Sequence, residues 1–253
     1  GVMCLCRKFE CPAKIVIDLQ HNASKALLQK LQAVPQYQNC FIAPEDALVE
    51  LDEDSLLVVV DTNRPDQVES KELLSSAGRV AVIDHHRRAA DYIEGALLNF
   101  HEPYASSACE LVTELVQYLT DREDVLPVET LSLLAGIVLD TKNFSVRTGA
   151  RTFEAAAWLR KNGADTVAVK LLFQNDLHAT LDRYQIIQHA ELYRGNIALC
   201  CLDYTSDRII AAQAADELLN ISGIEASFVF YPDGDRVICS ACSIGAANVQ
   251  MIL

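Results

Sequence analysis

The 253-residue sequence has no long hydrophobic run and few basic residues. No apolar stretch approaches the roughly 20 residues that a membrane-spanning helix needs, and the first residues lack the layout of a signal peptide. With 21 Lys and Arg against 35 Asp and Glu, the formal net charge of −14 disfavours broad electrostatic binding of duplex nucleic acid or an anionic membrane. The sequence therefore predicts a soluble chain, and a small anionic substrate would need metal ions to supply positive charge.

Glycine and proline are also scarce, at 10 and 7 residues, which excludes collagenous and low-complexity sequences. This length, with 51% hydrophobic residues, suits one large domain or two smaller ones. Nine cysteines are an odd number in a chain that does not need disulfides, so we expect a reducing, cytoplasmic location. Cys239 and Cys242 have zinc-ligand spacing, but they fall in a predicted strand, where we expect opposite faces and buried thiols.

Short apolar runs alternate with amphipathic stretches over the first half of the chain. The apolar runs have the length and β-branched content of buried strands and cover 14–17, 56–60, 80–83 and 96–100. Helical spacing is found over 24–34, 44–50, 70–77, 107–120, 128–139, 151–161 and 166–173. Buried strands separated by helices predict an α/β fold with a parallel sheet covered on both faces.

The pattern changes near residue 190. Residues 179–192 have helical spacing and are expected to link two domains. Beyond them we predict a strand over 196–202, a helix over 209–219, and a hairpin of 226–231 with 236–240 that turns at an Asp-Gly pair. A second, smaller α/β domain is therefore expected.

Two predicted strands are followed by acidic residues. Asp61 follows the run 56–60, and Asp84, His85 and His86 follow the run 80–83. Ligands of open α/β sheets bind outside the carboxyl ends of the strands, so we expect these side chains on one rim. Asp140, at the end of a predicted helix, is a third acid. Carboxylates with an imidazole suit Mn²⁺, Fe²⁺ or Zn²⁺ better than Ca²⁺, although turn or helix-capping roles are the alternative for each acid.

Three motifs in this order resemble the signature set of the DHH phosphoesterase superfamily: Asp61-Thr62-Asn63, Asp84-His85-His86 and Asp140-Thr141. Residues 105–110 and 136–156 resemble, more narrowly, the GdpP-type cyclic-di-AMP phosphodiesterases. The resemblance covers essentially the whole chain. It implies a parallel-sheet, Rossmann-like DHH domain over 1–177, a linker helix over 178–192 and a smaller α/β DHH-associated, substrate-binding domain over 193–253.

The resemblance further implies a metal-dependent phosphodiesterase that hydrolyses cyclic-di-AMP to pApA. Two metal ions, expected to be Mn²⁺, would activate a water molecule for attack on phosphorus. The implied metal ligands are Asp61, which bridges the two ions, together with His85 and Asp140. Asp84 would orient a ligand through a hydrogen bond, and His86 would contact the substrate phosphate rather than the metal.

Other polar residues near the expected rim have two interpretations each. Ser106 and Ser107 open the predicted helix 107–120, whose free N–H groups could bind a substrate phosphate, but an ordinary N-cap explains them equally well. His101 follows a predicted strand, and a solvent-facing loop position is the simpler expectation. Arg147 and Arg151 could reach a phosphate, and Arg151 could equally pair along its helix with Glu154.

Two family motifs are not found in the sequence: the early His followed by two Asp, and the Gly-Gly-Gly-His loop of the associated domain. By the resemblance, one metal ion would then keep Asp61, His85 and Asp140, and the other would keep only Asp61. We therefore expect this chain alone to bind metal weakly and to hydrolyse little, whereas the full-length protein is the enzyme.

Several alternatives remain open at this stage. The nanoRNase and pAp-phosphatase branch of the superfamily is the second choice, because the segment 142–149 also fits it. A non-catalytic nucleotide-binding module is the alternative outside enzymes. Single-strand exonucleases should carry a basic channel with stacking aromatics, which this acidic chain lacks. Manganese pyrophosphatases carry a different second domain.

The expected partner is a cyclic dinucleotide or a short oligonucleotide. Duplex nucleic acid and direct membrane contact by this chain are not expected, and a homodimer is left open. The full-length protein is expected to be anchored in the membrane with its catalytic region in the cytoplasm, as the resemblance implies.

Overall fold

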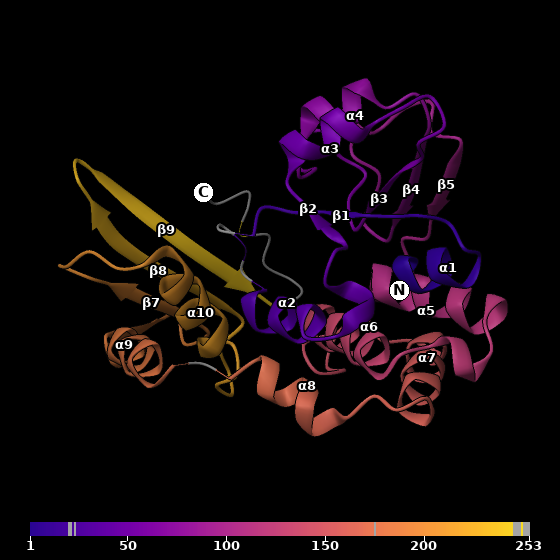
Figure 1. The fold of residues 1–253 in the computed structure, drawn as a ribbon. Coiled ribbons are helices and arrows are strands. Elements are labelled where there is room, and N and C mark those ends of the chain that lie inside the picture. The colour runs from indigo at the N-terminus through magenta and orange to yellow at the C-terminus, as the bar shows by residue number, and fades with distance from the viewer. Residues whose placement is uncertain (20–21, 23, 175, 245–248, 250–253) are drawn as a thin grey trace. The chain divides into compact units, whose positions relative to one another are not determined.

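The computed structural model describes residues 1–19, 22, 24–174, 176–244 and 249. It divides the chain into two compact units, Gly1–Phe173 and Gln174–Leu253. Figure 1 shows both units as ribbons coloured along the chain from indigo to yellow. In the described part of the chain, no helix combines the length and apolar character that a membrane span requires.

The first unit contains short strands and helices that alternate up to residue 101, followed by helices. Its strands are β1 (Ile15–Val16), β2 (Phe41–Ile42), β3 (Leu57–Val60), β4 (Val80–Asp84) and β5 (Leu98–His101). Its helices are α1 (Val2–Lys8), α2 (Lys25–Gln32), α3 (Pro44–Glu50), α4 (Lys71–Ser76), α5 (Ala108–Leu119), α6 (Pro127–Asp140), α7 (Ala150–Lys161) and α8 (Thr166–Leu172), with 3-10 turns η1 (Pro35–Tyr37) and η2 (Arg122–Asp124).

The strands of the first unit are parallel throughout. β3, β4 and β5 form one sheet with β4 in the centre, and β1 and β2 form a separate pair. Val59 and Val82 pack with Ile93 on one face of the larger sheet, while Ile83 and Phe100 join the helical core on the other. Figure 1 shows α3 and α4 on one side of this sheet and α5, α6 and α7 gathered on the other. The predicted α/β fold with parallel strands is confirmed.

The second unit is a mixed four-stranded sheet with two helices. It comprises α9 (Leu177–Gln188), β6 (Ala190–Tyr193), β7 (Ile197–Cys201), α10 (Arg208–Leu218), β8 (Ala226–Asp233) and β9 (Arg236–Ser243). The strand order is β6-β7-β8-β9, and only β7 and β8 are parallel among these neighbours. Ile186, Ala198, Ala211 and Val229 share one core between the helices and the sheet. The predicted hairpin is present, with Gly234 at φ +61° in its turn.

One predicted helix ends earlier than the sequence pattern suggests. The stretch expected to be helical to residue 192 ends at Gln188, and β6 follows it directly. β6 pairs with β7 through a three-residue turn, 194–196, in which Arg194 and Gly195 both have positive φ. This turn carries Ala190–Tyr193 into the sheet, and α9 lies within the second unit, packed against α10.

Candidate metal centre

Asp61 begins the candidate site, immediately after β3. Its backbone N–H donates to the Ile83 carbonyl at 2.9 Å, so the residue is tied to the end of β4. Its φ of +65° is in the left-handed region, which costs most non-glycine residues about 1 kcal/mol and which Asp tolerates better than most. The backbone turn at the strand end therefore directs the exposed Asp61 carboxylate along the rim of the sheet.

His85 brings two carboxylates together. Its Nε2 lies 3.3 Å from Oδ1 of Asp61 and 3.6 Å from Oδ2 of Asp140, the last residue of α6. The His85 side chain is 5% exposed, whereas those of Asp61 and Asp140 are 55% and 29% exposed. Three elements that are far apart in sequence thus place their donor atoms around one point open to solvent.

The electrostatics of this cluster favour a cation. Burial and the neighbouring Asp61 charge raise the pKa of Asp140. Burial alone would lower the pKa of His85, but the hydrogen bond with Asp61, the two carboxylate charges and a bond to the Ala105 backbone raise it overall. A divalent ion would relieve the repulsion between the carboxylates, and oxygen donors with one imidazole suit Mn²⁺, Fe²⁺ or Zn²⁺. The donor set therefore fits a metal.

His86 lies at the edge of the same group. Ligand atoms of Asp61, His85 and His86 all fall within 4.8 Å of one another, and the two imidazole ring centroids are 4.3 Å apart. Nδ1 of His86 is hydrogen-bonded to Oδ1 of Asp84 at 2.8 Å, and the His86 side chain is 51% exposed. His86 is therefore near enough to serve a metal, while its open side also suits a substrate phosphate.

Asp84 is fully buried beneath these residues. It accepts hydrogen bonds from His86 and from Nδ2 of Asn63, the latter at 2.5 Å to Oδ2. Burial acts to raise its pKa, but the hydrogen bonds from His86 and Asn63 outweigh burial, so the pKa lies below its usual value. Asp84 is thus an ionised carboxylate that orients other side chains and does not itself face the open point.

His101 differs from the loop residue expected from the sequence. It is the last residue of β5, in register with Asp84, and its side chain is only 11% exposed. Its Nε2 donates to the backbone carbonyl of His86 and lies 4.0 Å from Oδ2 of Asp84. The expectation of a solvent-facing loop histidine was therefore wrong, because β5 extends one residue beyond its apolar run.

Ser106 and Ser107 are fully buried at the start of α5. The Ser107 hydroxyl accepts from the N–H of Glu110, and the Ser106 hydroxyl donates to Oε2 of Glu110 at 2.5 Å. Glu110 also accepts from the hydroxyl of Thr152 in α7 at 2.7 Å. Ser107 is thus the N-cap of α5 and Ser106 binds Glu110. The contact of both serines with a substrate phosphate stays a prediction.

Glu110 is a buried polar residue that sequence reasoning did not single out. Its only signal was a position three residues after Ser107, the spacing of a helix-capping pair. Arg151 was considered as a partner of Glu154, but its guanidinium pairs instead with Glu114 of α5 through two bonds of 2.7 Å. Arg147 is exposed, and its charge acts to lower the pKa of Asp140.

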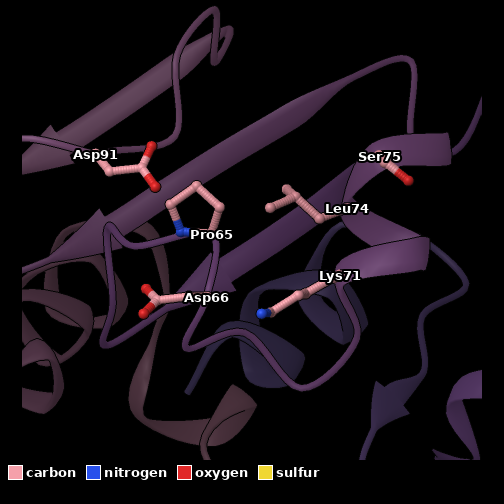
Figure 2. A pocket seen from close by; sticks show the side chains of 6 residues that line it. All are labelled: Pro65, Asp66, Lys71, Leu74, Ser75 and Asp91. Atoms are coloured by element: carbon pink, nitrogen blue, oxygen red, sulfur yellow. The ribbon is translucent and has the colours of Figure 1, made fainter.

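The first unit also has a surface recess. It is lined by residues that follow β3, by α4 and by Asp91: Pro65, Asp66, Lys71, Leu74, Ser75 and Asp91. Figure 2 shows the six side chains that line this recess from close by. It contains neither Asp61, His85 nor Asp140, so the candidate metal centre is defined by the donor cluster rather than by a cavity.

The chain belongs to the DHH family. The family model described as the DHH family N-terminal domain matches residues 6–137. A solved structure with the same fold is an exopolyphosphatase-related protein from Bacteroides fragilis, with a TM-score of 0.79 and 17% sequence identity. The match covers 97% of this chain and 74% of that chain, and at this identity it shows the fold alone.

Two curated relatives are cyclic-di-AMP phosphodiesterases. GdpP of Bacillus subtilis (strain 168) is 42% identical over 246 residues, which cover 94% of this chain and 37% of the relative. PdeA of Listeria monocytogenes serotype 1/2a (strain 10403S) is 44% identical over 232 residues, covering 90% and 35% respectively. The chain therefore spans little more than a third of the length of these relatives. The resemblance to GdpP-type proteins is confirmed.

Proposed function

We propose that this chain is the catalytic region of a metal-dependent phosphodiesterase that hydrolyses cyclic-di-AMP to pApA. The observation that carries the proposal is the convergence of Asp61, His85 and Asp140, with His85 Nε2 within 3.6 Å of both carboxylates. The activity of the two relatives, cyclic-di-AMP phosphodiesterase, supports the choice of substrate. Mn²⁺ is the proposed metal, since the donor set suits transition metals.

The residues of the metal centre have separate roles in metal and substrate binding under this proposal. Asp61, His85 and Asp140 would hold metal. The sequence resemblance supports a role for Asp61 that is shared between two ions. Asp84 would hold the imidazole of His86 through Nδ1. Because Nδ1 of His86 is taken up by Asp84, Nε2 is the nitrogen that would meet a phosphate oxygen of the substrate.

The bound ions would polarise the phosphoryl group and lower the pKa of a water molecule, as divalent metals do in two-metal sites. The residues of this chain contribute position and charge. His85 is fixed on its other side by the Ala105 backbone, so its Nε2 is held toward Asp61 and Asp140. The buried Asp84 carboxylate keeps His86 in one orientation, which lowers the entropy lost when a phosphate binds.

Three broader assignments belong to the same proposal. The second unit would bind substrate as the DHH-associated domain. The full-length protein would be anchored in the membrane with this region in the cytoplasm, and it could form a homodimer. The sequence resemblance supports the assignments of the second unit and of the membrane anchor, and the homodimer stays a prediction.

The test is a turnover assay of the natural full-length protein, loaded with Mn²⁺, against cyclic-di-AMP, pApA, pAp and pyrophosphate in parallel. We expect cyclic-di-AMP to be cleaved fastest and removal of metal by chelation to abolish the reaction. Asp140→Asn should abolish turnover, whereas the control Asp66→Asn should not, because Asp66 pairs with Arg64 outside the donor cluster. Faster cleavage of pApA or pAp would instead support the nanoRNase and pAp-phosphatase function, and binding without cleavage would support the non-catalytic module.

A further inference from the structure

The chain leaves the sheet after β4 through residues 85–92, which we call the β4 exit loop. β4 lies between β3 and β5, and the last backbone bond of the β4–β5 ladder joins the N–H of Glu102 to the carbonyl of Asp84 at 3.0 Å. Beyond Asp84, side chains from the two flanking strand ends take over. Asn63 contacts the exit loop from the β3 side, and His101 contacts it from the β5 side.

Asn63 binds the later part of the exit loop. Its Nδ2 donates to the Arg87 carbonyl at 3.4 Å, and its Oδ1 accepts from the Ala89 N–H at 3.1 Å. Its backbone carbonyl accepts from the N–H of Ile93 at 2.8 Å. These bonds fix the loop from residue 87 onward, and they leave the carbonyl of His86 to be satisfied from elsewhere.

His101 binds the loop at His86. Its Nε2 donates to the His86 carbonyl, for which no backbone N–H partner occurs among the described residues. Because Nε2 is the donor, the bond requires a hydrogen on that nitrogen. The His101 side chain is only 11% exposed, and the parallel register places it beside Asp84. The buried His101 imidazole thus binds one backbone atom of the exit loop, the carbonyl oxygen of His86.

His86 is consequently held at two points. His101 fixes its backbone and Asp84 fixes its ring through Nδ1 at 2.8 Å. The imidazole nevertheless stays half exposed, so its remaining nitrogen is presented at a defined place on the open side of the site. Neither anchor alone gives this result, because a ring held by Asp84 on a mobile backbone would still move.

We propose that His101 is a positioning residue for His86, which sets where the His86 imidazole meets the substrate phosphate. The inference rests on the proposed function, in which His86 contacts that phosphate. Neither a hydrogen bond nor an ion pair joins His101 to Asp61, His85 or Asp140 in the described part of the chain, so it acts on substrate rather than on metal.

The test compares two replacements in the natural full-length protein loaded with Mn²⁺. His101→Met removes the donor at similar size, and we expect kcat for cyclic-di-AMP to fall about 10- to 100-fold. His101→Gln keeps an N–H donor, and its kcat should stay within about threefold of the unchanged protein. The dissociation constant for Mn²⁺, measured by calorimetry, should be unchanged in both variants. If His101→Met does not fold, His101→Asn replaces it, because its shorter amide cannot reach the carbonyl.

A matched control removes a similar bond elsewhere. His189 bonds the carbonyl of Gln185 through Nδ1 at 2.8 Å in the second unit, so His189→Met should leave kcat within about twofold of the unchanged protein. Because His101 acts through His86, the double variant with His86→Ala should turn over no more slowly than His86→Ala alone.

The outcomes separate the two proposals. If His86→Ala lowers kcat but His101→Met does not, or if His101→Gln loses as much as His101→Met, the positioning role is overturned and the proposed function stands. Additive losses in the double variant also overturn the positioning role. If neither His85→Ala nor His86→Ala changes turnover, the proposed function itself fails.

Discussion

Two buried carboxylates of the first unit, Glu129 and Asp84, lie in polar clusters that differ in their exposure to solvent. The Glu129 carboxylate is enclosed, whereas the Asp84 cluster reaches the surface. Glu129, 1% exposed, accepts from Nη1 and Nη2 of the Arg7 guanidinium, from Tyr37 at 2.6 Å and from the Leu126 N–H at 2.7 Å. Every direction around it is filled by a donor. Asp84 accepts from Asn63 and His86, but its cluster continues outward through the half-exposed His86.

The comparison of the two clusters indicates which of them requires a bound cation. The Glu129 cluster ties α1 and η1 to the start of α6 and is complete within the chain, as stabilising polar clusters are. Beside the Asp84 cluster, Asp61 and Asp140 face the same nitrogen of His85, and burial and mutual repulsion raise the pKa of Asp140. A cluster of acids without enough donors is completed by a cation, so only this cluster indicates a functional site.

The largest expected effect is on activity, from His85→Ala. Loss of a metal ligand removes several kcal/mol of transition-state stabilisation, so we expect turnover of cyclic-di-AMP by the full-length protein to fall about 10³-fold. Mn²⁺ affinity should fall with it, and calorimetry with a single-substrate assay would measure both. Unchanged turnover of His85→Ala would show that the cluster around Asp84 and His85 is no more a functional site than the Glu129 cluster.

The next largest effect is on stability, from Glu129→Ala. This change leaves Arg7 and Tyr37 without their shared acceptor, and removing one partner of a buried ion pair costs about 3 kcal/mol. Urea unfolding of the chain, followed by circular dichroism, would measure the loss. Mn²⁺ affinity should stay unchanged, because Glu129 belongs to the complete cluster, and a fall in metal affinity equal to that of His85→Ala would contradict this separation.

Acidification should weaken the Glu129 cluster to a smaller extent. Burial opposes ionisation, but Arg7, Tyr37 and the Leu126 N–H lower the pKa of Glu129 below its usual 4.5. Its stabilisation is therefore complete above pH 4.5 and is lost as the pH falls through the lower folded-state value.

Comparison with Glu129→Gln isolates this contribution. Arg7, Tyr37 and Cys4 face the carboxylate and keep their protonation state in this range, since the pKa values of all three are raised above their ordinary values. The difference in unfolding free energy between the unchanged chain and Glu129→Gln should be constant from neutral pH downward and shrink below pH 4.5. A difference that grows on acidification would show that the pKa is raised instead.

The smallest effect is expected at the surface. Arg151 and Glu114 form a two-bond pair whose arginine side chain is 46% exposed, so Arg151→Ala should cost about 0.5–1 kcal/mol of unfolding free energy. Glu154→Ala is the matched control and should cost less, since Glu154 is not the partner. Equal losses in urea unfolding would show that the helical pairing operates after all.

The local pattern of the sequence was sufficient for most elements of the first unit. β3 and β4 follow from runs of β-branched residues, and the acids after them follow from the rule that ligands gather at the carboxyl ends of parallel strands. β2 and β6 were not predicted. β2 has only two residues, and β6 is a strand because a tight turn brings it beside β7, which no local apolar pattern encodes.

The partners of the polar residues were harder to predict than the residues themselves. His101 was identified as near the site but placed in a loop, because the register that sets it beside Asp84 is a property of the sheet. Glu110 was passed over, although it joins α5 to α7 through Thr152, 42 residues away. Arg151 was given a partner three residues away, while the actual partner lies 37 residues earlier.

The sequence by itself determined the α/β class, the acidic character of the chain and the types of donor available at 61, 84, 85 and 140. Hydrophobic periodicity and residue chemistry are local properties, so they can be recognised in the amino-acid sequence alone. The tertiary structure alone decided that His85 faces both Asp61 and Asp140, that Asp84 is buried and that His101 holds the backbone of His86. These contacts depend on strand register and on the packing of α6 against α5, which in turn contacts β4. Residues distant in sequence set both together.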